Sequence, residues 1–218
     1  MGTITRTFAN NITTSGVFKP TAFNDASFDN VTAVPSGAVE GGNMVLLSTQ
    51  TASGDASISF TTGIDSTYKE YMFVFNNIHP ATDGANFTFN LSTDGGSSYN
   101  VTKTTTYFQA NHYESDASAF NYEGGSDLAQ STSYQRIAVE MGNGSDECAS
   151  GTISLFNPSD TTYVKHFISS FNCYLNSDRS LIQYVGGYAN TTSAINAIDF
   201  KFSSGNIDDG TIQMFGIL

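Results

Sequence analysis

The sequence predicts an all-β protein, built as a sandwich or barrel and preceded by an extended N-terminal arm. Of its 218 residues, 53 are Ser or Thr and 20 are Gly, aromatic residues make up 13%, and Leu occurs only eight times. β-Branched and aromatic side chains suit a pleated, half-buried strand, whereas Ser, Asn and Asp bond to their own backbone and disfavour helix. Alternating segments also recur roughly every 8–12 residues, as in sandwiches and barrels.

Alternation of apolar and polar residues locates the strands. Phe87, Phe89 and Leu91 alternate with polar residues and so share one face. Residues 70–78 are apolar on both faces for part of their length, which predicts a central strand. The same test predicts eleven or twelve strands: Met44–Leu47, Ala56–Thr61, Glu70–Ile78, Asn86–Leu91, Val101–Ala110, Ala119–Tyr122, Tyr134–Met141, Thr152–Phe156, Tyr163–Leu175, Leu181–Tyr188, Ala194–Phe202 and Thr211–Ile217.

The turn Asp94-Gly95-Gly96 predicts a hairpin between the strand at 86–91 and the next strand, because glycine enters positive φ without a Cβ clash. A second hairpin is expected between 152–156 and 163–175. Paired residue numbers would then sum to about 319–321, which places Cys148 almost opposite Cys173. A disulfide between them is one interpretation, formed after release from the cell, and two free buried thiols are the other.

The face alternation also predicts the core and an apolar surplus. We expect ten side chains to be buried: Tyr71, Phe73, Phe75, Phe87, Phe89, Ile153, Phe167, Ile198, Phe200 and Ile212. A sandwich needs only one apolar face per sheet. Four further apolar residues then need a second cover: Met72, Val74, Ile195 and Met214. A homotrimer would supply that cover, and the chain's own N-terminal arm is an alternative.

Residues 1–42 differ from the rest and are predicted to be a docking arm and linker, with the β domain at 43–218. Isolated phenylalanines on a polar tether pack poorly with one another but can anchor in pockets of another protein. The alternative is a disordered leader. The predicted docking side chains are Phe8, Phe18, Phe23 and Phe28.

The charge and hydropathy of the chain argue against nucleic-acid-binding and membrane-spanning proteins. Eight Lys and Arg against 20 Asp and Glu give a net charge of −12, with no basic run to follow nucleic-acid phosphates. No apolar stretch approaches the roughly 18 residues of a membrane span. The N-terminus lacks a secretory signal, so we expect synthesis in a cytoplasm.

No residues nominate a catalytic site. His79, His112 and His166 are dispersed, and no nucleophile elbow, phosphate loop or Cys-x-x-Cys occurs. The carboxylates concentrate in turns, and the sequence does not single out two of them as the catalytic acid and base of a glycosidase. Binding of Ca²⁺ by carboxylate and backbone oxygens of these turns is an alternative. We expect no enzyme activity and no cofactor.

The segment 111–133 is long, acidic and aromatic. We expect it to form a long exposed loop outside the sheet that binds a ligand or receptor. A solvated loop without a ligand is the alternative. The side chains assigned to this contact are Tyr113, Asp116, Tyr122 and Glu123.

Four segments resemble virion proteins of marine tailed phages, especially those that infect cyanobacteria: Met1–Phe18, Ser57–Asp83, Ser92–Asn100 and Ala194–Leu218. The resemblance implies a jelly-roll-like sandwich that trimerises on the particle, with the capsid surface as a further alternative cover for the surplus apolar residues. It implies a non-enzymatic capsid decoration or head or tail fibre at the virion surface, in contact with capsid or tail proteins. Adhesion to a host-surface glycan or protein is a second function, and a polysaccharide-degrading enzyme a third.

Overall fold

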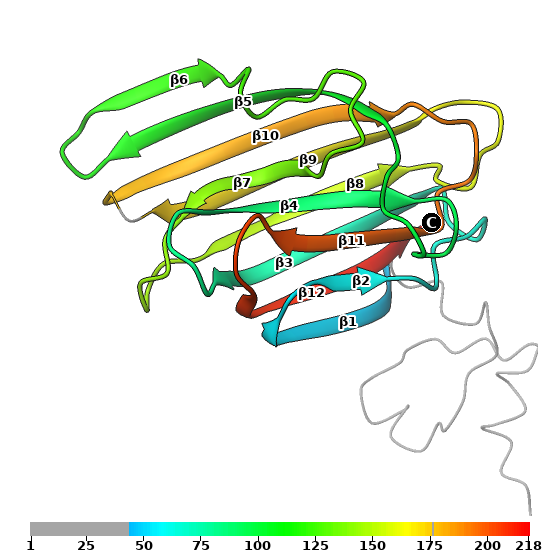
Figure 1. The fold of residues 1–218 in the computed structure, drawn as a ribbon, viewed down its shortest axis with the longest axis horizontal. Coiled ribbons are helices and arrows are strands. Elements are labelled where there is room, and N and C mark those ends of the chain that lie inside the picture. Colours follow the sequence, from blue (N-terminus) through cyan, green and yellow to red (C-terminus); the bar gives the residue numbers. More distant parts are fainter. Residues whose placement is uncertain (1–43, 176) are drawn as a thin grey trace, which may run out of the picture. The chain divides into compact units, whose positions relative to one another are not determined.

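The computed structural model describes residues 44–175 and 177–218. The predicted docking arm with Phe8, Phe18, Phe23 and Phe28 lies outside the described residues. The described chain is all-β, as predicted, with two antiparallel sheets layered face to face (Figure 1). Its strands are β1 (Met44–Asp55), β2 (Ile58–Phe60), β3 (Glu70–Pro80), β4 (Ala85–Ser92), β5 (Lys103–Tyr113), β6 (Ser118–Tyr122), β7 (Gln135–Met141), β8 (Ala149–Phe156), β9 (Lys165–Leu175), β10 (Arg179–Ala189), β11 (Ala197–Phe202) and β12 (Ile207–Ile217).

The strand order is that of a jelly roll with two insertions. The large sheet runs β1-β12-β3-β8-β9-β10-β5-β6 and the small sheet β2-β11-β4-β7. If β5, β6, β9 and β10 are set aside, two four-stranded sheets remain, β1-β12-β3-β8 and β2-β11-β4-β7. This is the eight-stranded jelly-roll arrangement, so the expectation from the sequence is confirmed. The inserted strands extend the large sheet beyond β8, toward the top of Figure 1.

Each predicted strand is present, but one predicted pairing is wrong. Gly95 and Gly96 do have positive φ, 74° and 88°. However, β4 pairs with β11 and β7, whereas β5 pairs with β10 and β6. The Asp94 carboxylate closes the turn locally by accepting from the Ser92 hydroxyl at 2.6 Å and the Ser98 amide at 2.9 Å. Such a turn reverses the chain without making its flanking strands partners, so the chain crosses between the sheets here.

The core between the sheets is rich in phenylalanine. All ten residues predicted to be buried are at most 1% exposed. The ring of Phe75 is central: its centroid lies 4.9 Å from Phe171, 4.9 Å from Phe200 and 5.8 Å from Phe87. Ile195 and Met214 also belong to this core. Their assignment to the apolar surplus that needs a second cover was therefore wrong: Met214 lies on the buried face of β12, and Ile195, in the loop before β11, is buried in the same core.

Beneath β7 the interior becomes polar. The side-chain oxygen of Gln183 accepts from the Tyr107 hydroxyl and, at 2.8 Å, from the Val139 amide. Thr105 donates to the side-chain oxygen of Gln135 at 2.7 Å. These bonds join the edge strand β7 to β5 and β10 of the large sheet. They satisfy polar groups whose burial would otherwise be costly.

Candidate functional site

The best-defined exposed surface is the outer face of the large sheet, because its inner face packs on the small sheet. Direct cross-strand partners share a face of a sheet. Burial alternates along the strands, and the register places most of the exposed large apolar side chains on the outer face. These are Met44, Leu46, Phe120, Tyr122, Ile168 and Tyr184.

One end of this face forms an apolar patch, made of Met44, Leu46, Met72, Val74, Phe215 and Ile217. Leu46 lies opposite Phe215, and Phe215 lies opposite Met72, so the three side chains form one row across β1, β12 and β3. Leu46 is 52% exposed. Met72 and Val74 are half-buried and point away from the core, as the sequence predicted. A contiguous exposed apolar surface of this kind is typical of a protein contact.

The other end of the outer face forms an aromatic patch, made of Phe108, Phe120, Tyr122 and Tyr184. The ring of Phe108 stacks on Tyr184 at 5.2 Å and lies 5.8 Å from Phe120. Between the two patches, β8 presents the small polar side chains Thr152 and Ser154 outward, with Phe156 at its end. Ile168 of β9 lies opposite Ser154 and is also exposed, so the outer face carries two clusters of large apolar side chains with Ile168 between them.

A hollow of about 650 Å³ lies beside the β8–β9 turn and borders the outer face. It is lined by Phe156, Asn157, Asp160, Thr162, Tyr163, Val164, His166 and Thr192. His166 also lines a second hollow of about 280 Å³, with Thr104–Thr106, Gly186, Gly187 and Tyr188. We call the two hollows together the turn groove.

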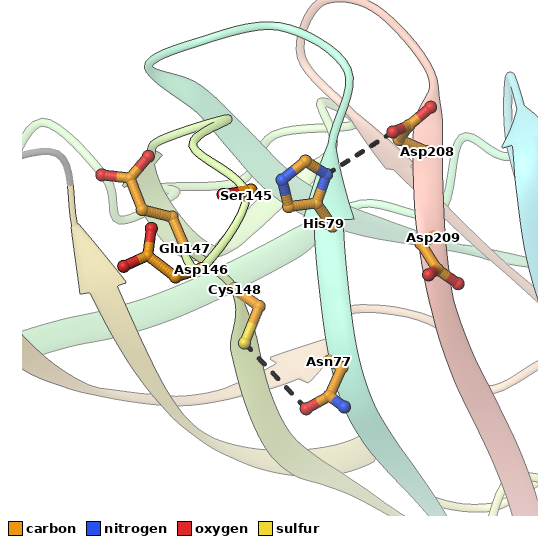
Figure 2. A pocket seen from close by; sticks show the side chains of 8 residues that line it. All are labelled: Asn77, His79, Ser145, Asp146, Glu147, Cys148, Asp208 and Asp209. Carbon is orange, nitrogen blue, oxygen red and sulfur yellow. Dashed lines mark hydrogen bonds and ion pairs between the residues drawn. The ribbon is translucent and has the colours of Figure 1, made fainter.

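A third hollow, of about 380 Å³, lies where β3, β12 and the β7–β8 loop meet (Figure 2). Irregular strand pairing changes the direction of the side chains that line this hollow. The register of β3 with β8 shifts between Phe75 and Ile78, and Asn77 has a φ of 53°. His79 Nε2 lies 3.0 Å from the Gly144 carbonyl oxygen, and Nδ1 lies 3.7 Å from Asp208 Oδ2. Both ring nitrogens are therefore occupied by this chain.

The chemistry of this third hollow is not that of an assembled catalytic site. Figure 2 shows the Cys148 thiol pointing toward Asn77, with Sγ 4.0 Å from Oδ1, rather than toward the His79 ring. Burial raises the pKa of the Cys148 thiol, which disfavours the nucleophilic thiolate. The Glu147 carboxylate accepts from the Gly144 amide at 2.6 Å and so shapes the loop. Among residues 44–175 and 177–218, no three His, Cys, Asp or Glu side chains are grouped to hold a metal ion.

The four predicted loop contacts do not form one site. The Tyr113 hydroxyl accepts a hydrogen bond from the Arg179 guanidinium at 2.6 Å, and the guanidinium lies over the Tyr113 ring. Tyr113 and Asp116 line one hollow at this end of β5. Glu123 lines a different hollow, and its carboxylate accepts a hydrogen bond from the Gln109 side-chain amide at 3.0 Å. Tyr122 lies on the aromatic patch, because 118–122 forms β6 along the edge of the large sheet.

Of the two interpretations of the cysteines, the structure agrees with free thiols and not with the disulfide. Both cysteines are free. The β8–β9 hairpin forms as expected, but Cys173 pairs with Ala149, and the Cys148 carbonyl accepts from the Tyr174 amide. A register one residue away from the expected one turns the Cys173 side chain into the core and Cys148 toward the third hollow. Burial raises the pKa of Cys173 to about 12.

Sequence reasoning missed Tyr163, His166 and Tyr188 as members of one site. His166 was interpreted as an isolated histidine. The register brings it opposite Tyr188, with ring centroids 6.2 Å apart. The Asn157–Asp160 turn was visible in the sequence and could have marked Tyr163 as an exposed aromatic after a rigid turn.

No protein family, curated protein or solved structure matches this chain. The resemblance to phage virion proteins stays a prediction. None of the described residues belongs to a helix that is long and apolar enough to cross a membrane.

Proposed function

We propose that this protein is a non-enzymatic structural protein of a phage particle, a capsid decoration or a head or tail fibre. In this proposal residues 1–42 dock on other virion proteins and the jelly roll is displayed at the virion surface as a homotrimer. The observation that carries the proposal is the exposed apolar patch on a tightly packed sandwich. The sequence resemblance stated above supports the virion setting.

The occupant proposed for the apolar patch is a second copy of the chain. With a net charge of −12, two copies repel each other at long range, so they can associate only through a surface that is poor in carboxylates. The patch meets this condition, with Glu70 at its border opposite Ile217. Strand β1 is also a sheet edge among the described strands, where its one partner is β12. Its free backbone groups and the neighbouring apolar side chains suit closure around a three-fold axis.

Light scattering on the full chain tests the assembly. A homotrimer has three times the 23.3 kDa chain mass, about 70 kDa. Leu46→Asp puts a carboxylate into the exposed centre of the patch and should reduce the measured mass to that of one chain. Ser204→Asp makes the same charge change at an exposed turn and should leave the mass unchanged. A wild-type mass near 23 kDa would exclude a self-sufficient trimer and leave the arm or the capsid surface as the cover.

The virion setting is tested separately by mass spectrometry of purified particles of the phage that encodes the chain. A copy number in the hundreds would indicate a capsid decoration, and one in the tens a fibre. Absence of the protein from purified particles would contradict the proposal.

A further inference from the structure

We propose that the turn groove is a saccharide-binding site that takes a neutral oligosaccharide longer than one sugar residue, with Tyr163 as its stacking platform. This proposal does not depend on whether the chain belongs to a phage particle. It rests on the preorganisation of Tyr163, the polar groups around it and the continuity of the two hollows.

Tyr163 presents an aromatic face on a fixed backbone. Its side chain is 72% exposed, and no other ring of the described residues contacts it. Its amide donates to Asp160 Oδ1 at 2.8 Å, and its carbonyl accepts from Lys165 Nζ at 3.1 Å. Large aromatic residues with few torsions lose little entropy on binding, and a fixed backbone lowers that cost further.

The turn that carries Tyr163 is itself cross-braced. Asp160 Oδ1 also accepts from the Thr162 amide at 2.6 Å, and the Asn157 amide donates to the Lys69 carbonyl at 2.6 Å. The backbone hydrogen bonds from Tyr163 and Thr162 lower the pKa of Asp160, so its carboxylate stays ionised and holds the turn.

The segment on the far side of the first hollow is tied to the same anchor. Lys165 is 1% exposed, and its Nζ donates to the Thr191 carbonyl at 3.2 Å as well as to that of Tyr163. The buried lysine thereby fixes the spacing between Tyr163 and the adjacent Thr192. Both walls of the hollow are set before any ligand arrives.

The turn groove is lined mainly by apolar surface with a few polar groups, a combination that suits the apolar face and the hydroxyls of a sugar ring. Asn157, Thr162, His166 and Thr192 line the same hollow as Tyr163, and they carry amide, hydroxyl and imidazole groups. An apolar face combined with a few placed polar groups is how small-molecule sites fix orientation, and Tyr suits both roles.

The second hollow gives the groove its length. It begins at His166 and crosses β10 to β5, where Gly186 exposes bare backbone. A Cβ at Gly186 would have Thr106 Oγ1 as its nearest contact, at 3.6 Å, so the floor is open. Tyr188 supplies a second aromatic side wall beside His166.

Charge and topology favour a neutral saccharide over the alternatives. An acidic polymer is repelled by the net charge of −12, and the Asp160 carboxylate, engaged by the backbone, offers little to a cation. Peptides commonly add a strand to a free sheet edge. The groove instead crosses β9 and β10, each of which has a strand on both sides, and reaches the part of β5 where the Thr105 amide donates to the Leu128 carbonyl.

Binding of the full chain to an array of neutral hexose and N-acetylhexosamine oligomers, followed by calorimetry with the best ligand, tests the site. Tyr163→Ala should weaken binding about tenfold or more, equivalent to about 1.4 kcal/mol. Gly186→Val should also weaken binding of longer oligomers by filling the floor, while a monosaccharide is affected less. Tyr174→Ala, at the opposite end of β9, is the matched control and should bind as the wild type does.

Absence of binding to every neutral oligomer on the array would overturn the proposal. So would binding that Tyr163→Ala leaves unchanged, or a preference of the groove for a peptide or an acidic polymer. The light-scattering mass of these variants should stay that of the wild type, so a failed saccharide site and a failed trimer give different results.

Discussion

Lys103, the first residue of β5, is a buried cation without a carboxylate partner. It is 0% exposed, and its Nζ donates to Asn90 Oδ1 at 2.5 Å and to the Val101 carbonyl at 2.8 Å. Both acceptors are neutral. Burial therefore lowers the pKa of Lys103 from 10.5 to about 7.

This shift makes the stability of the protein depend on pH. Below pH 7 the folded and unfolded states both bind the proton, so folding carries the full cost of a buried charge. Between pH 7 and 10.5 the unfolded chain binds a proton that the folded chain has released, so the free energy of unfolding rises with pH. The slope approaches 1.4 kcal/mol per pH unit, which amounts to about 2 kcal/mol between pH 7 and 9.

Urea denaturation followed by circular dichroism at pH 6, 7, 8 and 9 measures this dependence. Lys103→Met removes the titrating group, so its stability relative to the wild type should fall by about 2 kcal/mol from pH 7 to 9. The lost hydrogen bond to Asn90 adds a cost that does not vary with pH, so the slope is diagnostic. Lys69→Met, at an exposed lysine, is the control and should follow the wild-type curve. A constant difference between wild type and Lys103→Met across this range would refute the reasoning.

Two further predictions concern the core and the thiols. Phe89→Ala should destabilise the fold by about 3–5 kcal/mol, because Phe89 is fully buried and packs edge-to-face on Phe167 with centroids 5.1 Å apart. A measured loss below about 1 kcal/mol in urea denaturation would contradict this packing argument. In timed alkylation read by mass spectrometry, half-buried Cys148 should react in the folded protein, while Cys173 should react only on unfolding. Equal rates for the two thiols would contradict the register described here.

The sequence by itself determined where the strands lie and which face of most of them is buried, although Met214 of β12 was assigned to the wrong face. Alternation has a period of two residues and is a local property, so Phe73 and Phe75 could be placed on one face without knowing their partners. The same holds for Phe87 and Phe89. Composition likewise determined the all-β class, since no stretch carries helical periodicity.

The candidate surfaces were only partly predictable. Met72 and Val74 were identified as outward apolar residues, because they alternate with core residues on one strand. The rest of the apolar patch comes from β1 and β12, at opposite ends of the described chain, and was not assembled from the sequence. The turn groove was not predicted, because His166 meets Tyr188 only through the β9–β10 register.

Which strands pair, and in what register, was decided only by the tertiary structure. The Asp94-Gly95-Gly96 turn looks like a hairpin turn, yet its flanking strands enter different sheets. A register one residue away from the expected one separated Cys148 from Cys173. The physical reason is common to both cases: a turn or an alternation constrains a few neighbouring residues, whereas pairing is selected by the best burial among strands far apart in the chain.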